Sequence, residues 1–252
     1  MYKFFAKPLF FGKKVIFMTQ CHSTNDELSS MVKNESVPEG TVIYTDHQFK
    51  GRGQRGDKWE DEPGKSVLFS ILLKPSALSL SSQYLLNLVT GLAVLDTLKE
   101  KTRASLKLKW PNDIYLNNKK IAGVLIENNI KGRNIEFSVV GIGLNLNQKS
   151  VKIHQATSLL FETGVLYDRD DFLEDLLIYM EYWYLKLTHG KYHEIREAYH
   201  YSLLWKDEIR TFRDTHSVFK GIIKGINEYG KLIIEKKNEE FTYNVKEIQF
   251  VF

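Results

Sequence analysis

The chain has 252 residues, of which 43% are hydrophobic and 26% are charged, as in an ordinary globular protein with a substantial core. Its 35 basic and 31 acidic residues give a formal net charge of +4. That excess is too small for a dedicated nucleic-acid binder but suits anionic small molecules and an acidic protein partner.

No apolar run approaches the roughly 20 residues of a membrane span. The basic, aromatic N-terminus is interrupted by Lys7 and Pro8 and lacks a small-residue cleavage site, so we expect a mature cytoplasmic protein. The single cysteine, Cys21, excludes an intramolecular disulfide framework and a multi-cysteine metal site. His22 stands beside it, but adjacent side chains point in different directions, and we expect Cys21 to be buried rather than nucleophilic.

The first predicted elements are a strand over 14–20 and a helix that begins at Ser23–Thr24. Ser23 and Asp26, like Thr24 and Glu27, have the spacing of a capping box. Capping alone would explain these residues, so they do not by themselves indicate a site.

A second strand (41–48), a glycine-rich loop and a continuous apolar strand (67–75) follow, and a helix is predicted over 81–101, with serines suited to capping at its start. Three β-rich runs then form hairpins, and they read LKLKW, IYLNNKKIAGVLIEN and RNIEFSVVGIGLNLN. Two helical stretches, DDFLEDLLIYMEYWYLKLTHG and YHEIREAYHYSLL, lead to Trp205. After Trp205 the chain consists of short strands separated by turn residues, typical of a small β-barrel. We therefore predict an α+β chain with a mixed, largely antiparallel sheet flanked by helices in residues 1–204 and a small β-domain in residues 205–252.

The loop GRGQRG, Gly51 to Gly56, has the G-x-G-x-x-G spacing of a dinucleotide-binding motif. That motif requires the glycines to open a helix, and no amphipathic helix follows Gly56. The nearby sequence PGKS (63–66) ends like a P-loop, but Trp59 stands where the first glycine of that motif would fall. Both nucleotide motifs are excluded by context.

Four cations lie in and around this glycine loop, at Lys50, Arg52, Arg55 and Lys58. A loop that is flexible at its glycines and carries several cations can close over a strongly anionic ligand. A solvated surface loop with incidental charge explains the same residues.

A second group of polar residues lies in KLKWPNDIYLNNKKIAG (107–123). The turn at Pro111 directs Lys109, Asn112 and Asp113 towards one end of the sheet. Small residues at strand positions permit a ligand to approach the backbone closely. Such residues follow Lys120 at Ala122 and Gly123. They occur again in VVGIGLNLN, where Gly141 and Gly143 precede Asn145.

In combination, GRGQRGDKW, KWPNDIYLNNKKIAGVLIE and VVGIGLNLN, with STN at 23–25 and Gln48, resemble the motifs of the biotin–protein ligases. The resemblance runs from about residue 15 to the C-terminus. It implies a class II synthetase-like ligase fold, with a catalytic biotin- and ATP-binding domain in 1–204 and an SH3-like β-barrel in 205–252. Too few residues precede Ser23 for the family's DNA-binding extension, so the chain resembles the monofunctional class and no DNA partner is expected.

Members of this family join biotin to ATP, which gives biotinyl-5′-AMP and pyrophosphate, and then pass biotin to a lysine of a biotin carboxyl carrier protein. Adenylation brings an anionic carboxylate against an anionic phosphate, so cations must offset the repulsion and water must be kept from the anhydride. ATP chemistry implies Mg²⁺, although no metal motif demonstrates it. Whether the protein forms a homodimer is left open.

The resemblance also implies roles for individual residues. Ser23, Thr24 and Gln48 would hydrogen-bond the ureido head of biotin. Lys120 would contact the biotin carboxylate and the α-phosphate as the main catalytic group, Arg52 would face the same anions, and Asp113 would assist the incoming amine. The residues implied to bind biotin or nucleotide are Ser23, Thr24, Asn25, Gln48, Gly51, Arg52, Gly53, Gln54, Arg55, Trp59, Asn112, Lys120, Gly123, Gly143 and Asn145.

The chain departs from the family at two loop positions. Family loops often read G-R-G-R-R-G-R, whereas Gln54 and Asp57 replace two of those cations here. We therefore expect a weaker clamp on the adenylate and more leakage of this intermediate.

Two other functions stay open. A lipoate–protein ligase would share the fold and the adenylate strategy, but its R-R-x-x-G-G pattern is missing, and the polar STN and Gln48 suit a ureido ring better than a dithiolane. A non-enzymatic binding module, using the C-terminal barrel, is the alternative from a different class.

Overall fold

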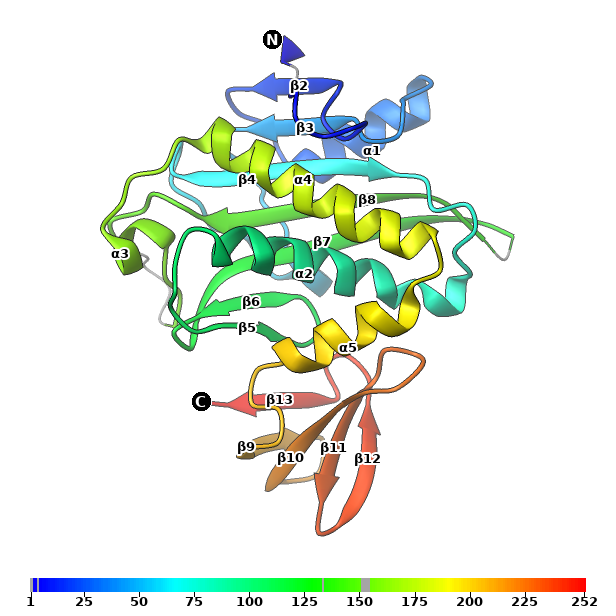
Figure 1. Cartoon of the computed structure of the whole chain (residues 1–252), viewed down its shortest axis with the longest axis vertical. Coiled ribbons are helices and arrows are strands. Elements are labelled where there is room, and N and C mark those ends of the chain that lie inside the picture. Colours follow the sequence, from blue (N-terminus) through cyan, green and yellow to red (C-terminus); the bar gives the residue numbers. More distant parts are fainter. Residues whose placement is uncertain (1, 4, 133, 151–154) are drawn as a thin grey trace.

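The computed structural model describes residues 2–3, 5–132, 134–150 and 155–252, and its larger sheet forms the body of the protein (Figure 1). That sheet has eight strands in the order β1-β2-β3-β4-β8-β7-β6-β5. Their bounds are β1 (Tyr2–Lys3), β2 (Val15–Met18), β3 (Val42–Thr45), β4 (Ser66–Leu73), β5 (Leu106–Lys109), β6 (Asp113–Leu116), β7 (Lys119–Lys131) and β8 (Asn134–Asn145). Only β2 and β3 pair in parallel among these strands, which confirms the predicted mixed, largely antiparallel sheet.

Helices cover both faces of this sheet, which explains why β4 is buried along its whole length. Helix α1 (Thr24–Asn34) packs against β3, β4 and β8, and its Leu28 joins Ile43 and Leu72 in a small apolar cluster. On the opposite face, α2 (Tyr84–Lys99) lies side by side with α4 (Arg169–Thr188) and α5 (Tyr192–Ser202), and all three helices contact the sheet (Figure 1). Because α2 is covered on all sides, its sequence is apolar all round rather than amphipathic.

The helix ends correct two predictions. Ser23 stands at the N-cap position of α1, but its side chain makes no capping hydrogen bond. The serines before α2 do not cap that helix either; they form a short 3₁₀ turn (Leu80–Ser82), and α2 begins only at Tyr84. Helix α4 behaves as predicted: acidic Asp168 caps it, and Gly190, with φ +72°, follows its end. The short helix α3 (Leu159–Thr163) was not expected.

The C-terminal sheet has five antiparallel strands in the order β12-β11-β10-β9-β13. Their bounds are β9 (Ile209–Asp214), β10 (Val218–Ile226), β11 (Leu232–Lys236), β12 (Glu239–Tyr243) and β13 (Ile248–Val251). This confirms the predicted α+β class with a small SH3-like all-β unit at the C-terminus. The division at residues 204 and 205 stays a prediction.

The two sheets are joined by direct contacts. The indole Nε1 of Trp110 donates to the carbonyl oxygen of Gly230 over 3.0 Å, and the rings of Tyr115 and Phe252 stack with centroids 5.6 Å apart. Within the described residues, no helix is long and apolar enough to cross a membrane.

Candidate active site

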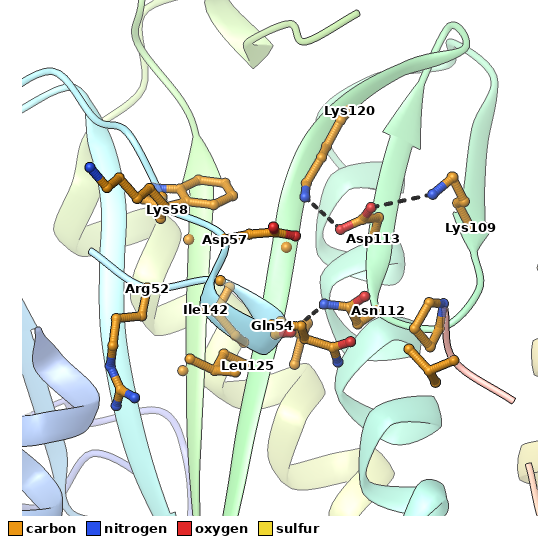
Figure 2. A pocket seen from close by; sticks show the side chains of 18 of the residues that line it. Arg52, Gln54, Asp57, Lys58, Lys109, Asn112, Asp113, Lys120, Leu125 and Ile142 are labelled. Carbon is orange, nitrogen blue, oxygen red and sulfur yellow. Dashed lines mark hydrogen bonds and ion pairs between the residues drawn. The ribbon is translucent and has the colours of Figure 1, made fainter. Parts of the chain in front are cut away.

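A cavity of about 430 Å³ lies between the large sheet and the end of the C-terminal sheet. The glycine loop, the start of α1, the β5–β6 turn, β7, β8 and β13 provide its walls, and Figure 2 shows some of the side chains that line it. Most of the residues predicted from the sequence line it, namely Ser23, Thr24, Asn25, Gln48, Arg52, Gly53, Gln54, Trp59, Asn112, Asp113, Lys120, Gly123 and Gly143.

One end of the cavity is a polar network at the start of α1. The side-chain oxygen Oε1 of Gln48 accepts hydrogen bonds from the backbone N of Thr24 (2.8 Å) and from its hydroxyl (3.1 Å). The hydroxyl oxygen of Ser70, from the buried strand β4, lies 2.7 Å from that of Thr24. These bonds leave the amide Nε2 of Gln48 as a donor for a ligand. The hydroxyl of Ser23 makes no capping bond and lines the cavity beside them.

The side-chain amide of Asn25 is hydrogen-bonded at both its nitrogen and its oxygen. Its Nδ2 donates to Glu127 over 2.7 Å, and its Oδ1 accepts from Ser70 over 2.6 Å. A Cβ atom on Gly141 would lie only 2.2 Å from that Oδ1, so glycine is required there. The close approach that the sequence predicted at Gly141 is therefore made by a side chain of the protein itself.

The other end of the cavity carries a carboxylate shared by two lysines (Figure 2). Nζ of Lys120 lies 2.6 Å from Oδ1 of Asp113, and Nζ of Lys109 lies 3.7 Å from Oδ2. Burial lowers the pKa of Lys109, while the charge of Asp113 opposes that shift. Beside them, Asn112 is fixed to β7 through its Nδ2, which donates to the carbonyl oxygen of Val124 over 2.7 Å.

Local backbone structure explains the orientation of Lys120. The β6–β7 register shifts between Ile114 and Tyr115, so an extra residue of β7 bulges next to Lys120. The backbone N of Lys120 donates to the carbonyl oxygen of Gln155 over 2.8 Å, which fixes the start of the strand.

The glycine loop folds back on itself as a narrow hairpin. Gly53 N donates to the carbonyl oxygen of Asp57 (2.7 Å), and Trp59 N donates to that of Gly51 (3.0 Å), around a 3₁₀ turn at Gln54–Gly56. The loop opens no α-helix, as predicted when the dinucleotide motif was excluded. Asp57 points from the loop into the cavity, towards the side that holds Lys120 and Asp113 (Figure 2).

The indole of Trp59 fills the space above two strand glycines. A Cβ atom on Gly143 would lie 2.4 Å from Cε2 of this indole, and one on Gly123 would lie 3.2 Å from Cζ3. The indole centroid is 5.8 Å from Nζ of Lys120. The prediction that these glycines let a ligand reach the backbone stays a prediction, and it now requires the ligand to lie against Trp59 or to displace it.

Arg52 lines the cavity, but its guanidinium is paired elsewhere. Its Nη2 lies 2.6 Å from Asp26 and 2.8 Å from Glu127, and Figure 2 shows the side chain pointing away from Lys120. Its predicted contact with the ligand anions therefore remains a prediction. Sequence reasoning missed Glu127, which contacts both Asn25 and Arg52, because nothing distinguishes it from other polar residues of a long strand.

Two predicted residues, Gly51 and Asn145, are described but lie outside this lining. Gly51 packs under Trp59, where a Cβ atom would lie 2.5 Å from the Trp59 carbonyl oxygen. Asn145 is buried and donates to the carbonyl oxygen of Thr157 over 3.1 Å. The side chain of Arg55 lies outside the described residues. Cys21 is buried, and burial raises its pKa to about 11, as expected for a structural thiol.

Comparison with known proteins assigns the fold around this cavity. Residues 17–145 match the model of the biotin/lipoate A/B protein ligase family. The chain belongs to this family. That segment contains the polar network, the glycine loop, Asp113 and Lys120, so the family match covers most of the cavity of this ligase-family protein.

Named relatives extend the match beyond that segment. The bifunctional ligase/repressor BirA of Bacillus subtilis is 32% identical over 89% of this chain and 72% of its own length. The biotin–[acetyl-CoA-carboxylase] ligase of Paracoccus denitrificans is 32% identical over 86% of this chain and 92% of its own. The structure of biotin protein ligase from Aquifex aeolicus in complex with biotin and ATP matches with a TM-score of 0.79, at 29% identity, over 94% of this chain and 99% of that one.

Proposed function

We propose that this ligase-family protein activates biotin with ATP to biotinyl-5′-AMP and transfers the biotinyl group to a lysine of a biotin carboxyl carrier protein. One observation carries the proposal: a single cavity joins a network of neutral hydrogen-bonding groups at Thr24 and Gln48 to the ammonium group of Lys120. A ligand with a polar, uncharged head and an anionic tail matches that arrangement. Relatives named as biotin ligases, matched over most of the chain, support the same assignment.

In the first step, a carboxylate oxygen of biotin attacks the α-phosphorus of ATP. A bond forms between this oxygen and the α-phosphorus while the bond between the α-phosphorus and the oxygen that bridges to the β-phosphate breaks. Pyrophosphate leaves with the electron pair of the broken bond. Lys120 supplies positive charge where the two anions meet, and Gln48 and Thr24 hold the head group so that the carboxylate reaches it.

In the second step, the amine of the acceptor lysine attacks the acyl carbon of the adenylate, and AMP leaves. The attacking nitrogen loses a proton, and Asp113 lies in the same cavity as Lys120 to accept it. The indole of Trp59 and the folded glycine loop cover this end of the site and limit the access of water to the anhydride.

Mg²⁺ enters this proposal with the nucleotide, since it neutralises phosphate charge in ATP chemistry. It usually binds through phosphates, waters and only one or two carboxylates, and Asp57 and Asp113 supply carboxylates at the cavity. Among the described residues, no group of three potential metal ligands marks a dedicated metal site. A carrier protein as acceptor, action in the cytoplasm and independence from DNA also belong to the proposal.

The direct test is to incubate the purified protein with biotin, ATP, Mg²⁺ and a biotin carboxyl carrier domain, and to measure the mass of the carrier. We expect the carrier to gain the mass of one biotinyl group, and a carrier with its acceptor lysine changed to arginine should gain none. An unmodified carrier would contradict the proposed transfer.

Two further measurements separate the alternatives. A lipoate ligase would be stabilised selectively by lipoate in a thermal-shift assay, whereas we expect selective stabilisation by biotin. A non-enzymatic binding module would show no biotin-dependent exchange of pyrophosphate into ATP.

A further inference from the structure

The carboxylate of Asp113 is held by two lysines in unequal settings. Lys120 makes the short contact, and its side chain is 35% exposed, while Lys109 lies farther from the carboxylate and is 19% exposed. Asp113 itself is only 13% exposed. A carboxylate this buried is costly to leave without a nearby cation.

Ligand binding creates such a cost. In the unliganded protein, Asp113 neutralises Lys120, yet the proposed reaction needs that ammonium group against the carboxylate and phosphate of the substrates. When Lys120 turns towards those anions, Asp113 loses its closest counter-ion. A second cation on the other carboxylate oxygen removes most of the penalty.

We propose that Lys109 is this second cation, a positioning residue that holds the Asp113 carboxylate in place while Lys120 moves to the ligand. The inference rests on the proposed ligase function and assigns a role to a residue that does not contact the reacting atoms. Lys109 acts through Asp113, and it makes Lys120 available for adenylation.

The surroundings of Lys109 suit a fixed partner. Lys109 and Asp113 are paired residues at the ends of β5 and β6, so their backbones stay in register. Nζ of Lys109 also lies 5.0 Å from the ring centroid of Phe250 and 5.8 Å from that of Tyr115, and these cation–π contacts offset part of the cost of burying this ammonium group. Phe250 belongs to β13, so the C-terminal sheet contributes to the charge balance of the site.

A double-mutant cycle on the adenylation step tests the proposal. Biotin-dependent ATP–pyrophosphate exchange is measured for the wild type, Lys109→Met, Asp113→Asn and the double variant. Lys109→Met should reduce exchange by about tenfold, the scale of removing one partner from a partly buried charge pair, because Asp113 then retains Lys120. Adding Asp113→Asn should restore exchange above the level of Lys109→Met, since a neutral amide no longer competes for Lys120.

Whether adding Asp113→Asn to Lys109→Met raises or lowers the exchange rate distinguishes a positioning role of Lys109 from a purely structural one. If Lys109 only supported packing, the double variant would be as slow as Lys109→Met or slower, and the proposal would be wrong. The proposal would also be wrong if the exchange rate of Lys109→Met stayed within about twofold of the wild-type rate. Lys107→Met is the matched control, because Lys107 lies on the same strand but does not line the cavity, and it should leave exchange unchanged. Thermal melting of each variant confirms folding. A wild type without any exchange would instead overturn the ligase function on which the inference rests.

Discussion

The Nη2 atom of Arg52 lies 2.6 Å from Oδ1 of Asp26, so this loop arginine is paired on the flank of the cavity and not at its cationic end. Glu127 accepts from the same Nη2 atom over 2.8 Å and also from Asn25. The polar network and the glycine loop are therefore linked through one carboxylate. For Arg52 to reach the ligand anions, it must first leave two carboxylates.

Replacement of Asp26 by asparagine should make that movement easier. We expect Asp26→Asn to lower the KM for ATP in pyrophosphate exchange by about two- to fivefold, because an exposed ion pair contributes only about 0.2–1 kcal/mol. Glu27→Gln, on the same helix and outside the cavity lining, is the control and should leave KM unchanged. A higher KM for Asp26→Asn would show that Arg52 acts from its present position.

Much of the fold could be predicted because its signals are local. The buried strand β4 is a continuous apolar run, and α4 has an acidic start and a glycine after its end. The β5–β6 turn placed Lys109, Asn112 and Asp113 together, since a tight turn between strands leaves little choice of direction.

The features of the site that the sequence did not predict have physical causes as well. Ser23 has the spacing of a capping residue, but capping spacing does not specify whether the hydroxyl turns to the helix or to a cavity. The ion pairs of Arg52 with Asp26 and Glu127 join residues far apart in the sequence, so no local pattern encodes them. The same holds for Trp59, whose indole occupies the space that the strand glycines open.

Lys120→Ala should impair adenylation far more than it weakens biotin binding. The ammonium group is needed most when the carboxylate meets the α-phosphate, so we expect single-turnover adenylation to fall by about 10²–10³-fold. Calorimetric affinity for biotin alone should change only a few-fold. Lys119→Ala is a close control, because Lys119 lies over the ring of Phe161 and not in the cavity lining. Normal single-turnover adenylation by Lys120→Ala would refute the role.

Gln54→Arg should retain the adenylate better than the native protein. Gln54 lies at the tip of the glycine loop and lines the cavity, so an arginine there adds positive charge near the phosphate (Figure 2). We expect the release of free biotinyl-5′-AMP, measured without acceptor, to fall by about two- to fivefold, as for one partly solvated charge interaction. Gln54→Glu reverses the charge and should increase the release. Equal release from all three proteins would count against the leakage hypothesis.

His200 connects α5 to the C-terminal sheet in its neutral form. Its Nε2 accepts a hydrogen bond from the backbone N of Ile226 over 3.2 Å, which requires that nitrogen to be unprotonated. Burial lowers the pKa of His200 from 6.5, and the nearby Lys206 and Arg196 add to the shift while Glu197 opposes it.

The lowered pKa predicts how the stability of the protein depends on pH. The unfolded chain binds a proton at His200 before the folded protein does, so the stabilising contribution of the neutral ring is complete above pH 6.5. It is lost as the pH falls from 6.5 through the folded-state pKa. We expect the melting temperature of the wild type to fall more between pH 8 and pH 5 than that of His200→Gln, whose amide oxygen can accept the bond from Ile226 without titrating. His193→Gln, at an exposed position on the same helix, should melt with the same pH dependence as the wild type. An identical pH dependence in His200→Gln and the wild type would contradict the assignment of the neutral ring.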